Sequence, residues 1–134
     1  MKNDEVFWTT LFHDVCKNDT TWSVSCPVED KKTLIMTTDG MKVYVVDGDW
    51  VKLRHNMDFV EGGNDAVYGY VPQGEVWIDG HVDDCDRPYI ALHELIERHM
   101  MKEHGLNYQK AHQVANKIEK DFRKDKLLPQ AGVL

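Results

Sequence analysis

The spacing of apolar residues changes near residue 86, and this change limits the folds open to the chain more than any other feature of its sequence. Residues 33–79 contain short runs rich in β-branched and aromatic residues, separated by Gly, Asp and Asn, which is the pattern of strands and turns. After residue 86, apolar residues recur every three or four positions, as on one face of a helix. The sequence therefore predicts an α+β fold in which a sheet precedes a pair of helices.

The sheet is expected to be a meander of four or five strands, mostly antiparallel. Asp47-Gly48 stands between two β-rich runs and is typical of a hairpin turn. Residues 61–65 include a Gly-Gly pair and indicate a turn or loop. The expected strands are residues 33–37, 41–46, 50–53, 66–71 and 75–79.

Helices flank this sheet in the sequence. Apolar residues at helical spacing predict a short N-terminal helix over residues 5–17. Asp86 can start a helix that Gly105 ends, and Asn107 can cap a second helix of roughly 17 residues. The link between these two helices is so short that they should form a helical hairpin against the sheet. The tail from Leu127 is expected to fray.

Length and charge limit the organisation and the partners of the chain. Its 134 residues fit one domain. With 16 basic and 23 acidic residues the net charge is −7, so a nucleic-acid partner would need a concentrated basic stripe. The best candidate, residues 117–126, alternates basic with acidic residues, as a solvated helix face does. We therefore expect no nucleic-acid partner.

Cysteine usage and hydropathy indicate the compartment. Cys16, Cys26 and Cys85 share no Cys-x-x-Cys spacing, which speaks against a disulfide framework or a zinc ribbon and favours reduced thiols. The sequence contains no apolar run of the roughly 20 residues that a membrane helix needs. The first residues do not resemble a signal peptide. A cytoplasmic protein without a membrane partner is the expectation.

Four polar side chains occupy the apolar faces of the two C-terminal helices. His93 and Glu97 are one helical turn apart and share a face with apolar residues. His112 and Glu119 lie on the apolar stripe of the second helix. Burying such groups costs free energy unless each finds a partner. A hydrogen-bond network, a His–Glu ion-pair cluster or a divalent cation could satisfy them, and zinc does so with one ion.

With His93-Glu94-Leu95-Ile96-Glu97 on one helix and His112 on the next, the chain resembles the zincin metallopeptidases. Their active-site helix carries His-Glu-x-x-His, and in the gluzincin branch a glutamate on a following helix completes the zinc site. Here Glu97 stands where the second histidine belongs, and the following helix offers His112. The set is still two histidines and one glutamate.

The chain is also similar to small, largely uncharacterised phage and bacterial proteins of zincin-like appearance. The shared segments are Lys42 to Gly48, Gly62-Gly63, Gly74 to Asp79, His93 to Glu97 and Ala111 to Ala115. This likeness covers residues 42–122 and leaves residues 1–40 unassigned. It implies a single domain with a zincin-like core over residues 41–126 and a tail over residues 127–134.

The resemblance implies that His93, Glu97 and His112 bind one Zn²⁺ ion and that Glu94 is the general base. Glu119 would orient His112 from behind, compete as a ligand, or simply pair with a lysine. The implied function is a zinc-dependent hydrolase, a metallopeptidase that cuts a peptide or protein substrate in the cytoplasm, that of a bacterial host if the chain is phage-encoded. The alternative is a non-catalytic interaction protein of phage or bacterial origin with a structural or vestigial metal site; the oligomeric state stays open.

Several other features have two interpretations. Residues 75–79 could be an edge strand that binds an extended peptide or an interior strand. His99 and His104 are expected to face solvent or cap the helix end. His81 and the Asp83-Asp84-Cys85-Asp86 run could form a rim or a second, oxygen-rich cation site, although helix-start acidity explains them more simply. Tyr108 could approach the open metal position, and residues 1–40 could dock a partner or cover the pocket.

Overall fold

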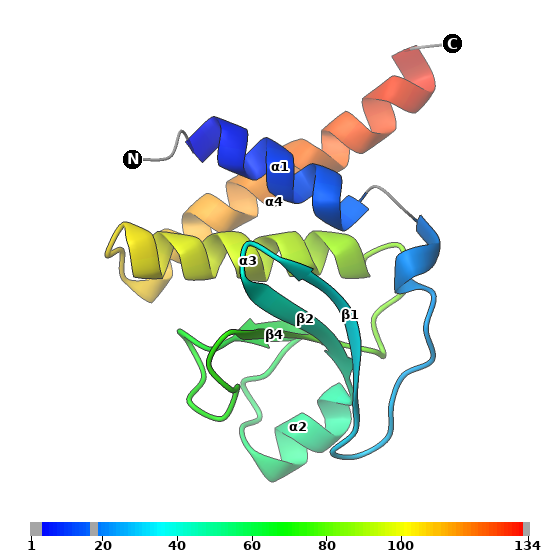
Figure 1. The fold of residues 1–134 in the computed structure, drawn as a ribbon, viewed down its shortest axis with the longest axis vertical. Helices are drawn as coiled ribbons and strands as arrows, with labels where there is room; N and C mark the ends of the chain where they lie inside the picture. Colours follow the sequence, from blue (N-terminus) through cyan, green and yellow to red (C-terminus); the bar gives the residue numbers. More distant parts are fainter. Residues whose placement is uncertain (1–3, 17–18, 133–134) are drawn as a thin grey trace.

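A computed structural model describes residues 4–16 and 19–132 of the chain (Figure 1). Within these residues, four α-helices and one 3₁₀ helix accompany a four-stranded sheet, so the predicted α+β class is confirmed. The elements are α1 (Asp4–Cys16), η1 (Asp19–Trp22), β1 (Lys32–Thr38), β2 (Met41–Val46), α2 (Gly48–Arg54), β3 (Gly62–Asn64), β4 (Glu75–Asp79), α3 (Arg87–Glu103) and α4 (Tyr108–Gly132).

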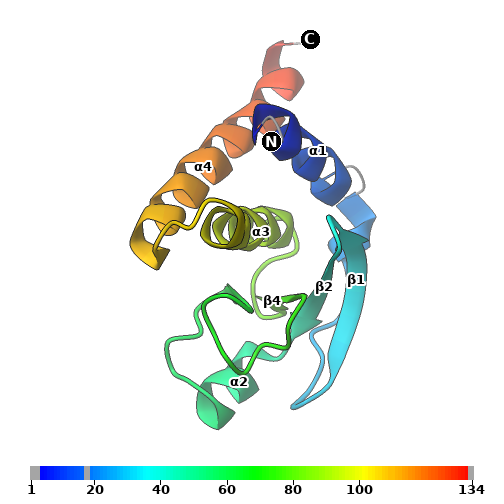
Figure 2. The ribbon, with the colours of Figure 1, turned by 60° about the vertical axis from the view of Figure 1, so that its left-hand side comes forward.

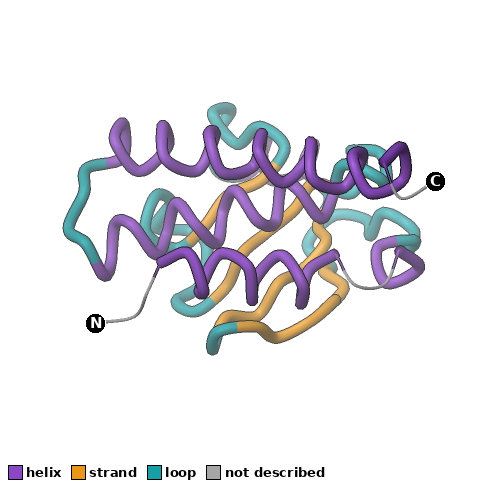
Figure 3. Tube along the Cα trace, turned by 90° about the horizontal axis from the view of Figure 1, so that it is seen from above, coloured by secondary structure: helices purple, strands orange, loops and turns teal. Residues whose placement is uncertain are grey.

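Helix α3 lies at the centre of the molecule. Figure 2 views it nearly end-on, with the sheet on one side and α1 and α4 on the other, and Figure 3 shows the three helices passing over the strands. Every residue from Arg87 to Glu97 is buried, because α3 packs against α1, α4, β3 and β4. A polar side chain on α3 therefore has to find its partners inside the protein.

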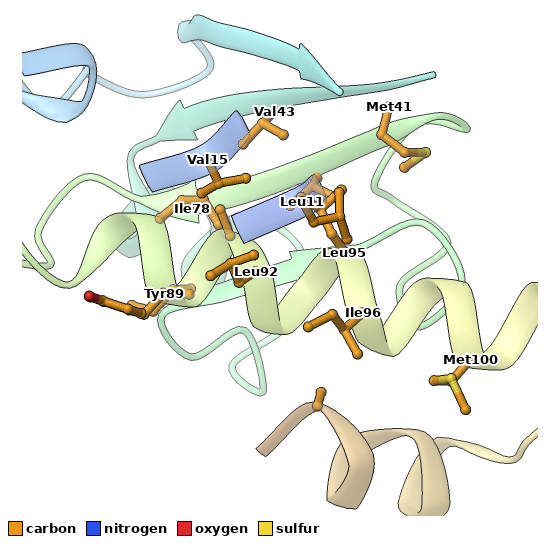
Figure 4. Packing of buried hydrophobic residues seen from close by; sticks show 14 of the residues in the cluster. Leu11, Val15, Met41, Val43, Ile78, Tyr89, Leu92, Leu95, Ile96 and Met100 are labelled. Atoms are coloured by element: carbon orange, nitrogen blue, oxygen red, sulfur yellow. The ribbon is translucent and has the colours of Figure 1, made fainter. Parts of the chain in front are cut away.

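One hydrophobic core joins these layers (Figure 4). Leu92 and Ile96 of α3 are fully buried, and Leu11 and Val15 of α1 pack with them. The sheet contributes Met41, Val43, Val45, Val76 and Ile78. Helix α1 is thus part of the core, as its apolar spacing predicted. Among the described residues, no helix is both long and apolar enough to cross a membrane.

The sheet is mixed and is not the predicted meander. Its strand order is β1-β2-β4-β3; β1 and β2 are antiparallel, β2 and β4 parallel, and β3 and β4 antiparallel. The chain leaves β2 through α2 and returns on the far side of β4, which makes the β2–β4 pair parallel. Strand β4 is therefore interior, which selects the second of the two interpretations of residues 75–79, and the edge on that side is β3.

The predicted hairpin at Asp47-Gly48 is also wrong. The Asp47 carboxylate accepts a hydrogen bond from the Trp50 backbone N–H at 3.3 Å and caps α2, so residues 50–53 are helical. A Cβ at Gly48 would collide with the Asp79 carboxylate. The sheet's one two-residue hairpin within the described chain instead turns at Asp39-Gly40, where both φ angles are positive.

Two further segments differ from expectation. Residues 62–64, expected in a loop, form β3, and residues 66–71, expected as a strand, form turns. In these turns Tyr68 and Tyr70 stack with ring centroids 5.1 Å apart. Aromatic residues that suit a strand are here used to cover the second face of the sheet, next to Phe59 and Trp77.

The C-terminal helices form the predicted hairpin. Asn107 caps α4 by accepting a hydrogen bond from the Lys110 N–H at 2.9 Å, and Gly105, with φ of 67°, lies in the turn. Asp86 stands at the start of α3 but makes no side-chain cap bond; its carboxylate binds Arg123 instead. Helix α4 continues to Gly132, beyond the predicted end.

Candidate metal centre

The hairpin of α3 and α4 brings together the three side chains that the sequence singled out as metal ligands. His93 Nε2 lies 3.2 Å from Glu97 Oε2 and 3.1 Å from His112 Nδ1. His112 Nδ1 lies 2.8 Å from the same Glu97 oxygen. One turn of α3 separates His93 from Glu97, and the short link between the helices places His112 opposite both. Three donor atoms thus form a small triangle.

The triangle fits a zinc ion by the chemistry of its donors. Tetrahedral zinc with bonds of about 2.0–2.1 Å places its ligand atoms about 3.3 Å apart, close to the observed separations. His93 and Glu97 are buried, whereas the His112 side chain is 40% exposed. A cavity of about 480 Å³ opens at the triangle and is lined also by Glu94, Tyr68 and other residues. The donors therefore have room beside them for a further ligand.

Hydrogen bonds could also satisfy this cluster, and the protonation of His93 shows how. Burial disfavours the charged imidazole, but hydrogen bonds to Glu119 and Glu97 outweigh burial and raise the pKa of His93 to about 10. These hydrogen bonds therefore favour the protonated form of His93 in the metal-free protein. A metal ion would have to displace this proton.

Glu119 contacts His93 and not His112, which corrects the expectation that it would orient His112. Its Oε1 lies 3.1 Å from His93 Nδ1, and its Oε2 accepts from Arg123 Nε at 2.9 Å. Burial raises the pKa of Glu119, but the hydrogen bonds from His93 and Arg123 lower it by more. Arg123 also donates to Asp86 at 2.9 Å. Glu119 thus orients the His93 ring so that its Nε2 points toward Glu97 and His112.

Glu119→Gln should weaken zinc binding at this centre by about 10- to 100-fold, because His93 loses the carboxylate that fixes its ring and raises its basicity. Competition with a chromophoric chelator measures the change. Glu103→Gln removes an exposed carboxylate from the last turn of α3 and should bind zinc as the wild type does. Equal affinity in Glu119→Gln and the wild type would show that this contact does not support the ligand.

Glu94 lies beside the triangle but is not one of its three donor residues. It is buried and lines the cavity. Burial and the neighbouring Glu97 carboxylate raise the pKa of Glu94 to about 7. A carboxyl group in this range can both take up and release a proton near neutral pH.

Asn64 of β3 is a site residue that the sequence interpretation missed. Its side chain is fully buried, and its Nδ2 donates to Glu94 Oε1 at 3.0 Å and to Glu97 Oε1 at 3.2 Å. A Cβ at Gly62 would meet Ile90 Cγ2 at 2.9 Å, so this glycine lets α3 lie directly on β3. The signal in the sequence was the Gly-Gly-Asn run, which fits close approach of a strand to a helix.

Two tyrosines complete the cavity wall. The Tyr68 hydroxyl donates to the Asp58 carbonyl at 2.8 Å, and burial together with the Glu94 charge raises the pKa of Tyr68 to about 12. The Tyr108 ring stacks on His112 at 5.3 Å between centroids. Tyr108 is therefore near the ligands, as the sequence suggested it could be.

The other histidines lie elsewhere. His99, expected at the surface, is buried and stacks on Phe7 of α1 at 4.1 Å between ring centroids. Its position on α3 faces the N-terminal helix, whose packing could not be seen from periodicity in α3 alone. His104 occupies the C-cap of α3, as predicted. His81 joins a separate cluster with Asp79 and Cys26.

The described residues thus hold a set of two imidazoles and a carboxylate that can bind a divalent metal ion, with a carboxyl group and a cavity beside it. Such a set can bind an ion structurally or present it to a substrate. Comparison with protein-family models, curated proteins and solved structures gave no match.

Proposed function

We propose that the chain is a zinc-dependent hydrolase that cleaves amide bonds in a peptide or protein substrate. His93, Glu97 and His112 would hold the ion, and Glu94 would be the general base. The observation that supports this most is the triangle of donor atoms, no side longer than 3.2 Å, at a cavity that a buried Glu94 also lines. The resemblance of the His-Glu-x-x-Glu helix to the zincin helix favours the same class.

The position of each site residue determines its proposed role in amide hydrolysis. A zinc ion bound here would lower the pKa of a bound water toward about 7 and polarise a substrate carbonyl. Asn64 donates to Oε1 of Glu94, so we assign to Oε2 the proton that the attacking water gives up. Glu94 then delivers that proton to the nitrogen of the leaving amine, which closes the proton balance of amide hydrolysis. Glu119 keeps the His93 ring in place throughout.

A mixture of many peptides tests the proposal, because it offers many different amide bonds at once. Zinc-loaded protein is incubated with peptides from a digested bacterial proteome, and new termini are counted by mass spectrometry. New termini are expected with the zinc-loaded protein and not after chelation of the zinc, because hydrolysis depends on the ion. If folded, zinc-loaded protein cuts no more than the chelated sample, the hydrolase proposal fails and an interaction protein with a structural metal is the better interpretation.

A further inference from the structure

A second group of metal-binding side chains lies at the carboxyl ends of the parallel strands β2 and β4. Val46 pairs with Asp79, and the Gly80 N–H donates to the Val46 carbonyl at 2.8 Å, so the segments after the two strands lie side by side. Ligands often bind where neighbouring parallel strands end. None of these residues lines the cavity of the first centre, so the two groups are separate.

Three different donor types meet here. His81 Nδ1 lies 2.9 Å from Asp79 Oδ1. Cys26 Sγ, from the segment that precedes β1, lies 3.9 Å from each of the two ring nitrogens of His81. The thiol, the carboxylate and the imidazole each place a ligand atom within 4.8 Å of the others. Small side-chain rotations would bring them to the separations of a tetrahedral zinc site.

The backbone is shaped to hold this group. Asp79 is buried, and its Oδ1 accepts from the N–H groups of Gly48 and His81 at 3.0 Å each. A Cβ at Gly48 would collide with the Asp79 carboxylate, and one at Gly80 would lie 2.7 Å from Cys26 Sγ. Two glycines thus allow the carboxylate and the thiol to approach the strand ends, and the two backbone N–H groups orient the carboxylate before any ion binds.

Charge around the group distinguishes a metal site from a nucleophilic thiol. Asp49 Oδ2 lies 3.6 Å from His81 Nε2, and Asp47 Oδ1 lies 3.9 Å from His81 Nδ1. Burial, followed by the charges of Asp47 and Asp79, raises the pKa of Cys26, and Arg87 offsets less than these. A Cys–His–Asp nucleophile needs a lowered thiol pKa, so these surroundings do not favour one. A divalent cation would offset the negative charge and stabilise the thiolate.

We propose that Cys26, Asp79 and His81 form a second metal site, selective for zinc-like ions. Thiolate and imidazole donors favour Zn²⁺ over Ca²⁺ or Mg²⁺. The proposal does not depend on the function of the first centre, because the two sites share no residue.

Cobalt(II) serves as a probe that distinguishes the sites, since the first centre has no sulfur ligand. Titration of the protein with Co²⁺ should produce a thiolate-to-cobalt charge-transfer absorption in the near ultraviolet. Cys26→Ser should lose this absorption, and Cys85→Ser, which changes an exposed cysteine, should keep it. His93→Ala should also keep it, whatever happens to the first centre.

His81→Asn is a second test variant in case Cys26→Ser does not fold. The His81 side chain is 47% exposed, so the substitution should not disturb the core. It should lower the affinity for Co²⁺, read from the same absorption, by at least about tenfold. The proposal is overturned if the wild type shows no thiolate absorption with excess Co²⁺. It is overturned equally if the absorption survives in Cys26→Ser or is unchanged in titrations of folded His81→Asn.

Discussion

Glu94→Gln is expected to lower the rate of peptide hydrolysis by about 10²- to 10⁴-fold and to leave the zinc content at the wild-type level. The amide has the shape of the carboxyl group and can still accept the hydrogen bond from Asn64. It cannot take the proton from the attacking water. Because Glu94 is not a corner of the donor triangle, the substitution should not weaken the hold on the ion. Turnover of a cleaved peptide and zinc analysis of the same sample measure both effects.

Two outcomes would contradict this assignment of Glu94. An unchanged rate would show that another group accepts the proton. Loss of zinc together with activity would show that Glu94 is a ligand. Glu103→Gln, which removes an exposed carboxylate from the same helix, controls for the change in charge and should retain both activity and metal.

Arg87→Met is expected to lower the free energy of unfolding by more than about 3 kcal/mol. Arg87 is 3% exposed, and its guanidinium joins the start of α3 to two other parts of the chain. It donates to the backbone carbonyls of Trp22, Val24, Gly80 and Val82 at distances between 2.6 and 3.1 Å. Methionine fills similar space and donates to none of them, so these carbonyls lose their partner.

Urea denaturation followed by tryptophan fluorescence measures this loss as a shift of the midpoint. Arg54→Met, at an exposed position in α2, should stay within about 0.5 kcal/mol of the wild type. A loss below about 1 kcal/mol in Arg87→Met would mean that water replaces the guanidinium at these carbonyls. The network would then not be what fixes the N-terminal segment to α3.

The helical part of the fold could be predicted from the sequence because its signals are local. Apolar spacing defined α1 and α3, and Asn107 marked the start of α4. After β2, residues 75–79 were predicted as the strand that forms β4, but α2 and β3 could not be predicted in the same way. Asp-Gly suits both a hairpin turn and a capped helix start, and at Asp47 the choice depends on the Asp79 carboxylate that lies against Gly48. That contact comes from the strand pairing, which the local sequence does not encode.

The candidate site, too, could be predicted only where its signals are local in the sequence. His93 and Glu97 are joined by helical spacing, and the short link limits where His112 can lie, so the triangle could be predicted. Asn64 could not, because its place beside Glu94 depends on β3 being the edge strand next to α3. The partner of Glu119 depends on the rotation of α4 about its own axis, which an apolar stripe defines only to within part of a turn.

Zinc analysis in a Cys26→Ser background tests most directly whether His93, Glu97 and His112 bind one ion, because the second cluster then lacks its thiol. After equilibration with zinc and removal of the excess, the Cys26→Ser protein should hold about one zinc per chain. Adding His112→Ala should remove it, with a loss of affinity at least as large as that caused by His93→Ala. Folded Cys26→Ser protein without zinc would contradict binding by these three residues, and unchanged zinc after His112→Ala would show that His112 is not a ligand.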